Sequence, residues 1–355
     1  MEKLAWTVLA FGTLLLASFG CGQPANEAGK GSIRIGGTLS LTGRFPVDGT
    51  HMHHGYQLWA KHINAKGGLL GRPVELLIYD DQSDPQTSAN LYQQLINRDK
   101  MYLVVGPYSS PIAIVASTVT EKLRYPMIPY AAADEIWSRG YKYVFEILQH
   151  GMHQLDGALA LAKQQGFKRI ALINENTVWA RTVALGIIET VPKMGLQLVF
   201  HEEYPKGTKD FRPLLARVKD RKAEVLLTGG YLEEDILIVR QLKQTAFVPK
   251  LYTSSFGAGF DDFGEALGQD AEYMLSTSEW EPQPSLGLPG MQRFIEDFQK
   301  EFGRMPNPTA AGGYGMGQVL EAAVAKAGSL DREKIRDALA VLDLVTVYGR
   351  QEVNG

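Results

Sequence analysis

The 355-residue chain contains one cysteine, Cys21, and therefore cannot form a disulfide within itself. It also lacks an excess of charge of one sign, because its formal net charge is −3 and no stripe of lysine and arginine runs along it. Proteins that bind nucleic acids use such basic surfaces to contact phosphates, so we exclude a nucleic-acid partner. What is present, 45% hydrophobic and 21% charged residues, describes a globular protein long enough to bury two cores.

The short motifs that mark common enzyme active sites are also missing. There is no G-x-S-x-G elbow, no H-E-x-x-H helix and no P-loop. Gly313-x-Gly315-x-Gly317 lies inside a helix pattern and does not follow a strand, so it is not a dinucleotide loop. Asp80-Asp81 could act as an acid–base pair, but the Asp84-Pro85 that follows is typical of a strand-end turn. We therefore expect no enzymatic activity and no cofactor.

The amino terminus differs in composition from the rest of the chain. Leu4–Gly20 is apolar and uncharged, which predicts a secretory signal peptide over residues 1–20 rather than a membrane-spanning helix. Cys21 follows directly and precedes a polar tract. A buried structural cysteine is the alternative, but a core residue would not lie at this boundary. We expect Cys21 to be a lipoprotein processing site, with residues 21–32 as a lipid-anchored tether.

Beyond the tether, strand and helix patterns alternate without a break. Such alternation predicts an α/β fold in which parallel sheets are covered by helices on both faces. We expect two Rossmann-like lobes joined by extended hinge segments. The predicted strands are 33–41, 73–79, 102–106, 126–130, 169–174, 197–204, 224–228 and 250–254, and the predicted helices are 111–123, 154–165, 180–191, 211–221, 233–245, 291–302, 309–327 and 331–342.

The first two strands and the segment between them form a βαβ unit. Tyr56, Trp59 and Ile63 give that segment one apolar helical stripe. Ligands of open α/β sheets bind beyond the carboxyl ends of the strands. The loops 41–48, 80–84 and 106–110 are therefore the first candidates for a binding site.

Four motifs in this region resemble those of a known family. They are LTG at Leu41–Gly43, IN-x-x-GG-x-x-G-R at Ile63–Arg72, DD-x-x-DP at Asp80–Pro85 and VVGP-x-SS at Val104–Ser110. In this order and spacing they resemble the N-terminal lobe of the periplasmic substrate-binding proteins of branched-chain amino-acid type, the receptors of ABC importers. The similarity in element order continues to about Gly349.

The resemblance implies a type I periplasmic-binding-protein fold with hinge crossovers between its lobes. Lobe I would comprise residues 33–147 and 279–348, and lobe II residues 148–278 and 349–355. The chain would cross near 145–150, near 273–279 and again near 347–350. Relatives continue with a strand pair that ends lobe II, so this sequence is either a fragment or has a trimmed lobe.

Ser109 and Ser110 are the predicted anion-binding residues. They follow a strand and precede the helix that opens at Pro111, where free N–H groups and the helix dipole favour a carboxylate. Plain N-capping by serine is the alternative, and both roles can hold together.

Two departures from the family bear on the ligand. Ala133 stands where amino-acid-binding relatives have a threonine, and the stretch 254–257 lacks the carboxylate that neutralises the ligand ammonium. A buried ammonium without an anion is strongly disfavoured, so we expect an aromatic or bulky apolar acid rather than an ordinary α-amino acid.

Aromatic residues are expected to supply the rest of the pocket. Trp179, Tyr231 and Phe256 all lie on predicted loops after strands, where they favour a cleft over a core, and Tyr108 and Phe45 would join them. The candidate ligand-binding residues are Asp48, Tyr108, Ser109, Ser110, Ala131, Ala132, Ala133, Trp179, Tyr231, Ser255 and Phe256.

His51, His53 and His54 form a cluster in which His51 and His54 are one helical turn apart. A metal site is conceivable, but no nearby cysteine or carboxylate pattern completes a ligand set. We expect a solvated helix start near the mouth of the cleft and no metal.

These observations predict a non-enzymatic, extracytoplasmic receptor that is held on the membrane by its lipid and is monomeric. It would close on a small organic ligand, amino-acid-like or an apolar carboxylate, and present it to an inner-membrane ABC permease. Three alternatives remain open: a ligand-sensing module of the same fold, a receptor for branched-chain amino acids proper, and an α/β enzyme.

Overall fold

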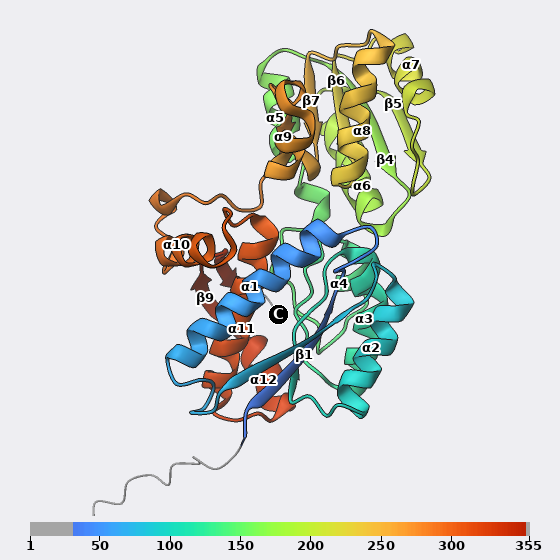
Figure 1. Cartoon of the computed structure of the whole chain (residues 1–355). Coiled ribbons are helices and arrows are strands. Elements are labelled where there is room, and N and C mark those ends of the chain that lie inside the picture. Colours follow the sequence, from blue (N-terminus) through green and yellow to red (C-terminus); the bar gives the residue numbers. More distant parts are fainter. Residues whose placement is uncertain (1–30, 353–355) are drawn as a thin grey trace, which may run out of the picture. The chain divides into compact units, whose positions relative to one another are not determined.

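The computed structural model describes residues 31–352, so the predicted signal peptide and Cys21 lie outside the described residues. Two parallel sheets organise the chain, as expected for an α/β protein (Figure 1). We call the elements around the first sheet the first lobe (β1 to α4 and α10 to β10), and those around the second sheet the second lobe (α5 to β8). Segments 138–155 and 277–290 connect them.

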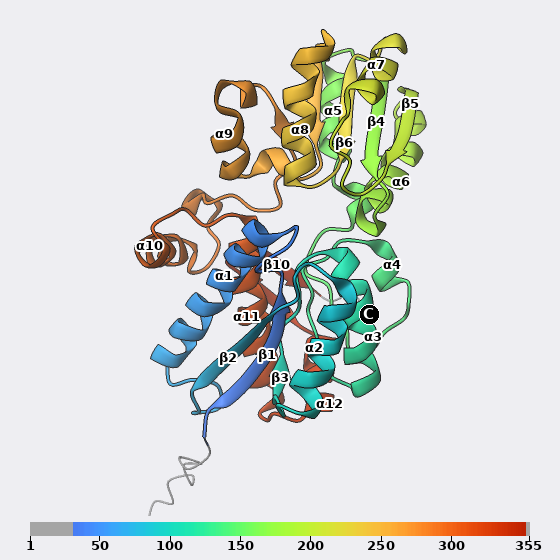
Figure 2. The same ribbon diagram turned by 45° about the vertical axis from the view of Figure 1, so that its right-hand side comes forward.

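The first lobe is built on a three-stranded sheet of order β2-β1-β3. Figure 2 shows α2 and α3 on one side of this sheet and α1 and α11 on the other. The elements are β1 (Ile33–Leu39), α1 (Pro46–Ala65), β2 (Val74–Asp80), α2 (Pro85–Asn97), β3 (Leu103–Val104), α3 (Ser110–Leu123), α4 (Asp134–Trp137), α10 (Met291–Phe302), α11 (Pro308–Ala327), α12 (Arg332–Leu339), β9 (Asp343–Thr346) and β10 (Gly349–Glu352).

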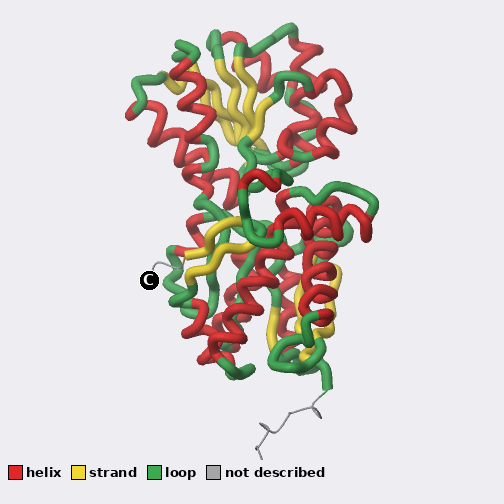
Figure 3. Tube along the Cα trace, turned by 90° about the vertical axis from the view of Figure 1, so that its left-hand side faces the viewer, coloured by secondary structure: helices red, strands yellow, loops and turns green. Residues whose placement is uncertain are grey.

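The second lobe is built on a five-stranded sheet of order β5-β4-β6-β7-β8, and Figure 3 shows its strands between layers of helices. Because every pairing in this sheet is parallel, all strands end at the same edge. The elements are α5 (Asp156–Gln164), β4 (Arg169–Glu175), α6 (Val178–Lys193), β5 (Gln197–Tyr204), α7 (Arg212–Asp220), β6 (Val225–Gly229), α8 (Leu232–Leu242), β7 (Leu251–Ser254), α9 (Asp261–Leu267) and β8 (Leu275–Ser276), with short 3₁₀ turns at Lys243–Thr245, Gly257–Gly259 and Gly268–Ala271. Two further 3₁₀ turns, Gly151–His153 and Pro284–Leu286, lie in the connecting segments.

Residues 126–130 do not form the predicted strand. The segment makes only isolated bridges, between Tyr130 and Tyr108 and between Met127 and Val144. Pro126 and Pro129 lack the N–H groups that a strand ladder needs, which explains the difference. The segment still runs past the end of the first sheet and brings Tyr130 to the site described below.

Glycines allow α1 and α11 to approach closely. A Cβ atom on Gly317 would lie 2.3 Å from the Trp59 ring, and one on Gly55 would lie 2.1 Å from the Ala310 carbonyl oxygen. The glycine run of residues 313–317 lies inside α11, as its helix pattern predicted. It therefore serves helix packing in the core of the first lobe.

The hairpin of β9 and β10 is antiparallel, and its turn carries Val347 and Tyr348. A third passage between the lobes is expected near these residues. The described part of the chain ends within this hairpin at residue 352, so that passage and the lobe boundaries at the carboxyl end stay predictions.

Candidate ligand-binding cavity

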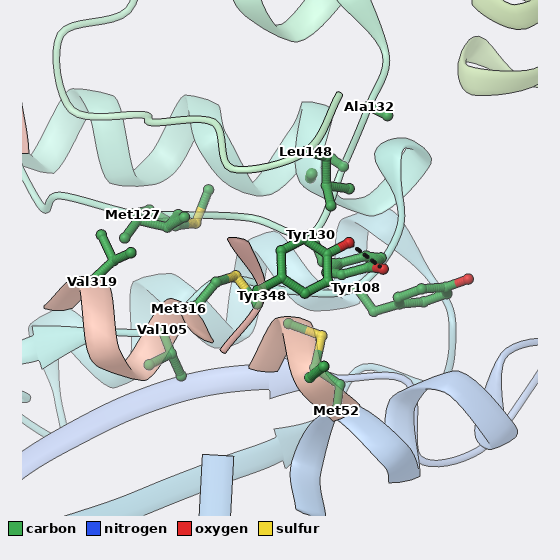
Figure 4. Close-up of a cluster of buried hydrophobic side chains, with 14 of the residues drawn as sticks. Met52, Val105, Tyr108, Met127, Tyr130, Ala132, Leu148, Met316, Val319 and Tyr348 are labelled. Carbon is green, nitrogen blue, oxygen red and sulfur yellow. Dashed lines mark hydrogen bonds between the residues drawn. The ribbon is translucent and has the colours of Figure 1, made fainter. Parts of the chain in front are cut away.

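A small cavity of about 30 Å³ lies where residues from both lobes meet. Most of its lining is apolar or aromatic, which is the usual composition of small-molecule sites. Figure 4 shows a cluster of buried hydrophobic side chains that includes four of the lining residues, Tyr108, Tyr130, Ala132 and Leu148. The lining residues are Tyr108, Ser109, Ser110, Tyr130, Ala131, Ala132, Leu148, Gln154, Trp179, Tyr231, Phe256 and Glu279.

One end of the cavity is formed by the start of α3. Ser110 is the first residue of the helix, and its Oγ accepts hydrogen bonds from the N–H groups of Ala132 and Ala133 at 3.1 and 3.2 Å. The Ser110 proton is then left for another acceptor. Ser109 is buried, and its Oγ has no partner among the described residues. Neither hydroxyl caps the helix, so the alternative role of plain N-capping is not observed for these side chains.

Backbone geometry supports an anion at this end. Ser109 has φ 76°, a left-handed conformation that is rare for a residue other than glycine and is found often at functional sites. The first turn of a helix carries N–H groups without helical partners and a partial positive charge. With the Ser110 proton, it offers donors suited to a carboxylate.

The second lobe contributes an aromatic wall. The Trp179 and Tyr231 rings lie 4.9 Å apart, and the Trp179 and Phe256 rings 5.8 Å apart. Phe45 of the first lobe packs against Tyr231 at 4.8 Å and against Tyr108 at 5.5 Å, although it does not line the cavity itself. These rings give the cavity its apolar surface.

Trp179 does not lie on a loop as expected. It is the second residue of α6, which begins at Val178 with Thr177 as its N-cap residue. The indole still reaches the cavity, because the first turn of α6 follows β4 at the edge where the strands end. Its Nε1 donates to Gln154 Oε1 at 2.9 Å.

Three of the predicted site residues are buried close by without lining the cavity: Asp48, Ala133 and Ser255. Asp48 lies in α1, and burial raises its pKa to about 7, while Tyr108 beside it lowers the pKa. Ala133 precedes α4. The Ser255 Oγ has no partner among the described residues.

Glu279 is the charged residue of this cavity that the motifs did not indicate. It follows β8 in connecting segment 277–290. Its Oε2 accepts hydrogen bonds from the hydroxyls of Tyr130 (2.6 Å) and Tyr348 (3.2 Å), and its Oε1 accepts one from Gln154 Nε2 (2.8 Å). Figure 4 also draws the 3.1 Å contact between the Tyr130 and Tyr348 hydroxyls, which is an alternative to one of the two tyrosine hydrogen bonds to Glu279 because each phenol carries one proton. Burial raises the pKa of Glu279, and the three hydrogen bonds lower it.

The stretch 254–257 does lack a carboxylate, but Glu279 supplies one to the same cavity. The expected ligand class stays a prediction. The motifs do not indicate Glu279, because it comes from a connecting segment far from each of them.

A buried ion-pair cluster joins the lobes beside the aromatic wall. Arg44 donates two hydrogen bonds to Glu175, at 2.9 and 2.6 Å, and lies 2.8 Å from Glu234. Its guanidinium also lies over the Phe45 and Tyr231 rings at 5.1 and 4.7 Å. Burial opposes the charge of Arg44, yet the two carboxylates raise its pKa overall.

Of the histidines near the start of α1, His51 is buried and not solvated as expected, whereas His53 and His54 are half-buried. His51 is only 2% exposed, and neither of its ring nitrogens has a partner in residues 31–352. Burial, then the charges of Arg304 and His54, lower the pKa of His51 to about 3. Within the described residues no group of three or more His, Cys, Asp or Glu side chains is arranged to hold a metal ion.

No helix in the described part of the chain has the length and apolar character needed to cross a membrane. Residues 32–353 match the family model described as periplasmic binding protein. A curated relative is the leucine-, isoleucine-, valine-, threonine- and alanine-binding protein of Pseudomonas aeruginosa, 27% identical, with 96% of this chain and 89% of the relative covered.

Solved structures share the fold. A leucine-binding protein from Thermotoga maritima superposes with a TM-score of 0.81 at 23% identity, covering 90% of each chain. A solute-binding protein from R. palustris in complex with benzoate gives 0.80 at 18% identity, covering 91% of this chain and 89% of that one. The protein is thus a binding protein and not an enzyme. The chain belongs to the periplasmic binding protein family, the extracytoplasmic solute receptors of ABC importers.

Proposed function

We propose that this receptor captures a small carboxylate with an apolar or aromatic body and delivers it to an ABC permease. The observation that carries the proposal is the cavity itself, which combines the donor-rich start of α3 with the aromatic wall of the second lobe. A carboxylate would bind the Ser110 end, and the body would pack against Trp179, Tyr231 and Phe256. Because both lobes contribute, binding favours their closure.

The relatives support this class of ligand. One curated relative is named for leucine, isoleucine, valine, threonine and alanine, and one solved structure of the fold holds benzoate. The two kinds of ligand share a carboxylate and differ in their amine and in the shape of their apolar body. We therefore propose that the ligand carries a carboxylate, which is the part that both kinds of ligand share.

The proposal is tested by isothermal titration calorimetry of the full chain. We would titrate L-leucine, 4-methylpentanoate, L-phenylalanine and 3-phenylpropanoate, with 3-phenylpropanamide as the uncharged comparison. We expect at least one acid to bind and the amide to bind more weakly, since the amide lacks the charge that the helix start favours. Binding of none of the acids would reject the proposed function.

Ser110→Ala tests the headgroup end. Loss of a charge-assisted hydrogen bond costs about 1.5–3 kcal/mol, or roughly ten- to hundredfold in affinity. The matched control is Ser117→Ala on the same helix, because Ser117 is buried, donates to the Ile114 carbonyl oxygen and does not line the cavity. Equal affinities of the two variants would remove Ser110 from the ligand site.

We further propose that the receptor is a monomer anchored by a lipid on Cys21. The support is the position of Cys21, directly after the apolar leader. Cys21→Ser should prevent labelling by radioactive fatty acid and move the protein from the membrane to the soluble fraction. Equal labelling of the variant would reject the anchor.

A further inference from the structure

Among residues 31–352, Glu279 is the only one that lines the cavity with an acidic or basic side chain, apart from the tyrosine hydroxyls. It is partly buried, and in residues 31–352 it forms no ion pair with a lysine, arginine or histidine. All three of its hydrogen-bond partners are neutral. The Glu279 carboxylate therefore accepts hydrogen bonds from the protein, but no cationic side chain of the described residues balances its charge.

Its acceptor capacity is also not exhausted. An ionised carboxylate offers about four acceptor positions, and Tyr130, Tyr348 and Gln154 occupy three of them. One position remains on a group that lines the cavity. A ligand group that donates a proton, and above all a cationic one, would fill it and balance the charge.

One short segment, residues 130–132, contacts both polar groups of the cavity, the Glu279 carboxylate and the Ser110 hydroxyl. Tyr130 donates its hydroxyl to Glu279, and two residues later the Ala132 N–H donates to Ser110. Glu279 and Ser110 are therefore both tied to residues 130–132, which lie on one wall of the cavity.

Gln154 ties Glu279 to the aromatic wall. The amide donates to Glu279 Oε1 and accepts from Trp179 Nε1. These two hydrogen bonds fix the Gln154 side chain, and Gln154 in turn orients the Glu279 carboxylate before a ligand arrives. A preorganised acceptor of this kind gives selectivity, because a ligand without the matching donor leaves it unpaired.

From these contacts we infer that Glu279 is a specificity-determining residue, whose carboxylate accepts an ammonium or other N–H donor of the bound carboxylate ligand. This inference rests on the proposed function and deepens it. It places the anion of the site on the segment that connects the lobes rather than on the stretch 254–257, where the family resemblance looks for it. A desamino acid would leave its apolar carbon beside an uncompensated carboxylate.

Two matched pairs of ligands test the inference by calorimetry on the full chain. L-phenylalanine differs from 3-phenylpropanoate, and L-leucine from 4-methylpentanoate, only in the amine. We expect the amine-bearing member of a binding pair to bind about tenfold tighter or more in the wild type. Glu279→Gln keeps the shape but removes the charge, so the preference should shrink to about threefold or less.

The outcomes separate the two claims. Binding of the acids without an amine preference, or a preference that survives in Glu279→Gln, overturns the role of Glu279 and leaves the carboxylate receptor intact. Binding of none of the four overturns the proposed function and this inference with it.

Tyr348→Phe is the matched control. It removes one hydrogen-bond donor from outside the cavity lining and keeps the Glu279 carboxylate, so the variant should retain the amine preference. Loss of the preference in Tyr348→Phe would also overturn the inference. If Glu279→Gln does not fold, the absence of an amine preference in the wild type still overturns the inference.

Discussion

At the scale of single residues, burial and hydrogen-bond partners together determine whether a side chain can carry a charge. Glu279 and Ser110 keep their polar atoms in defined hydrogen bonds, whereas His51 has no described partner for either ring nitrogen. An uncharged imidazole tolerates such a site far better than an imidazolium does. The lowered pKa of His51 thus has a direct consequence for stability.

We expect His51 to make the folded protein sensitive to acid. Its pKa in the folded state, about 3, lies below the ordinary value of 6.5, so between these pH values the unfolded chain binds a proton that the folded protein does not. The free energy of unfolding should therefore fall as the pH falls from 6.5 toward 3, and this contribution should be fully present above pH 6.5.

Urea unfolding of wild type and His51→Gln at pH 7.5 and 4.5 measures this effect. The variant should lose less of its unfolding free energy between the two pH values. An identical loss in both proteins would show that His51 takes no part in the acid response.

At the scale of elements, the core of the first lobe depends on the contact between α1 and α11. Gly55 faces the backbone of α11 and not a flexible side chain, so α11 must shift to accept a methyl group. Gly55→Ala should cost about 1–3 kcal/mol or more in the free energy of unfolding, as overpacked cores do.

The matched control is Gly157→Ala in α5. A Cβ atom there would meet nothing within 4 Å, and the position is exposed. It should stabilise the protein by about 0.5–1 kcal/mol, because alanine is the better helix residue. Chemical denaturation of both variants gives the comparison, and equal stabilities would contradict the packing argument.

Elements with strong local signals were predictable from the sequence. β5 and α10 have the expected bounds, and α10 ends at Gly303, whose φ of 71° is typical of a helix C-cap. The start of α6 was placed two residues too late, although Thr177 is a residue type that favours the N-cap position. The strand expected at 126–130 does not form, because Pro126 and Pro129 offset its apolar pattern by removing N–H groups from the ladder.

The candidate site was predictable only where it follows the ends of strands. Ser110, Tyr231 and Phe256 come from such positions, and they line the cavity. Glu279 is joined to Tyr130 and Gln154, which lie 149 and 125 residues away in the sequence. No periodicity or spacing within a single sequence reports contacts of that length, so the charge of the site required the fold.

At the scale of the whole molecule, the Arg44 cluster couples the two lobes. The side chains of Glu175 and Glu234 are 0% and 1% exposed, and that of Arg44 is 12% exposed. Two carboxylates share one guanidinium, which also packs between aromatic rings of both lobes. Removing the arginine would leave two buried negative charges side by side, and opening the lobes would rehydrate them.

We therefore expect Arg44→Ala to disfavour the closed form and weaken ligand binding by about 2–5 kcal/mol, the cost of truncating one partner of a buried charge pair. Calorimetry measures the affinity. In the presence of ligand, small-angle X-ray scattering should give a larger radius of gyration for Arg44→Ala than for the wild type.

Arg181→Ala is the control, because Arg181 pairs with Glu203 on the exposed surface of the second lobe. Such surface pairs contribute little, so affinity should be unchanged. The double variant Arg44→Ala/Glu175→Gln should recover part of the loss, because it leaves one buried carboxylate instead of two; wild-type affinity and scattering in Arg44→Ala would show that closure does not depend on this cluster.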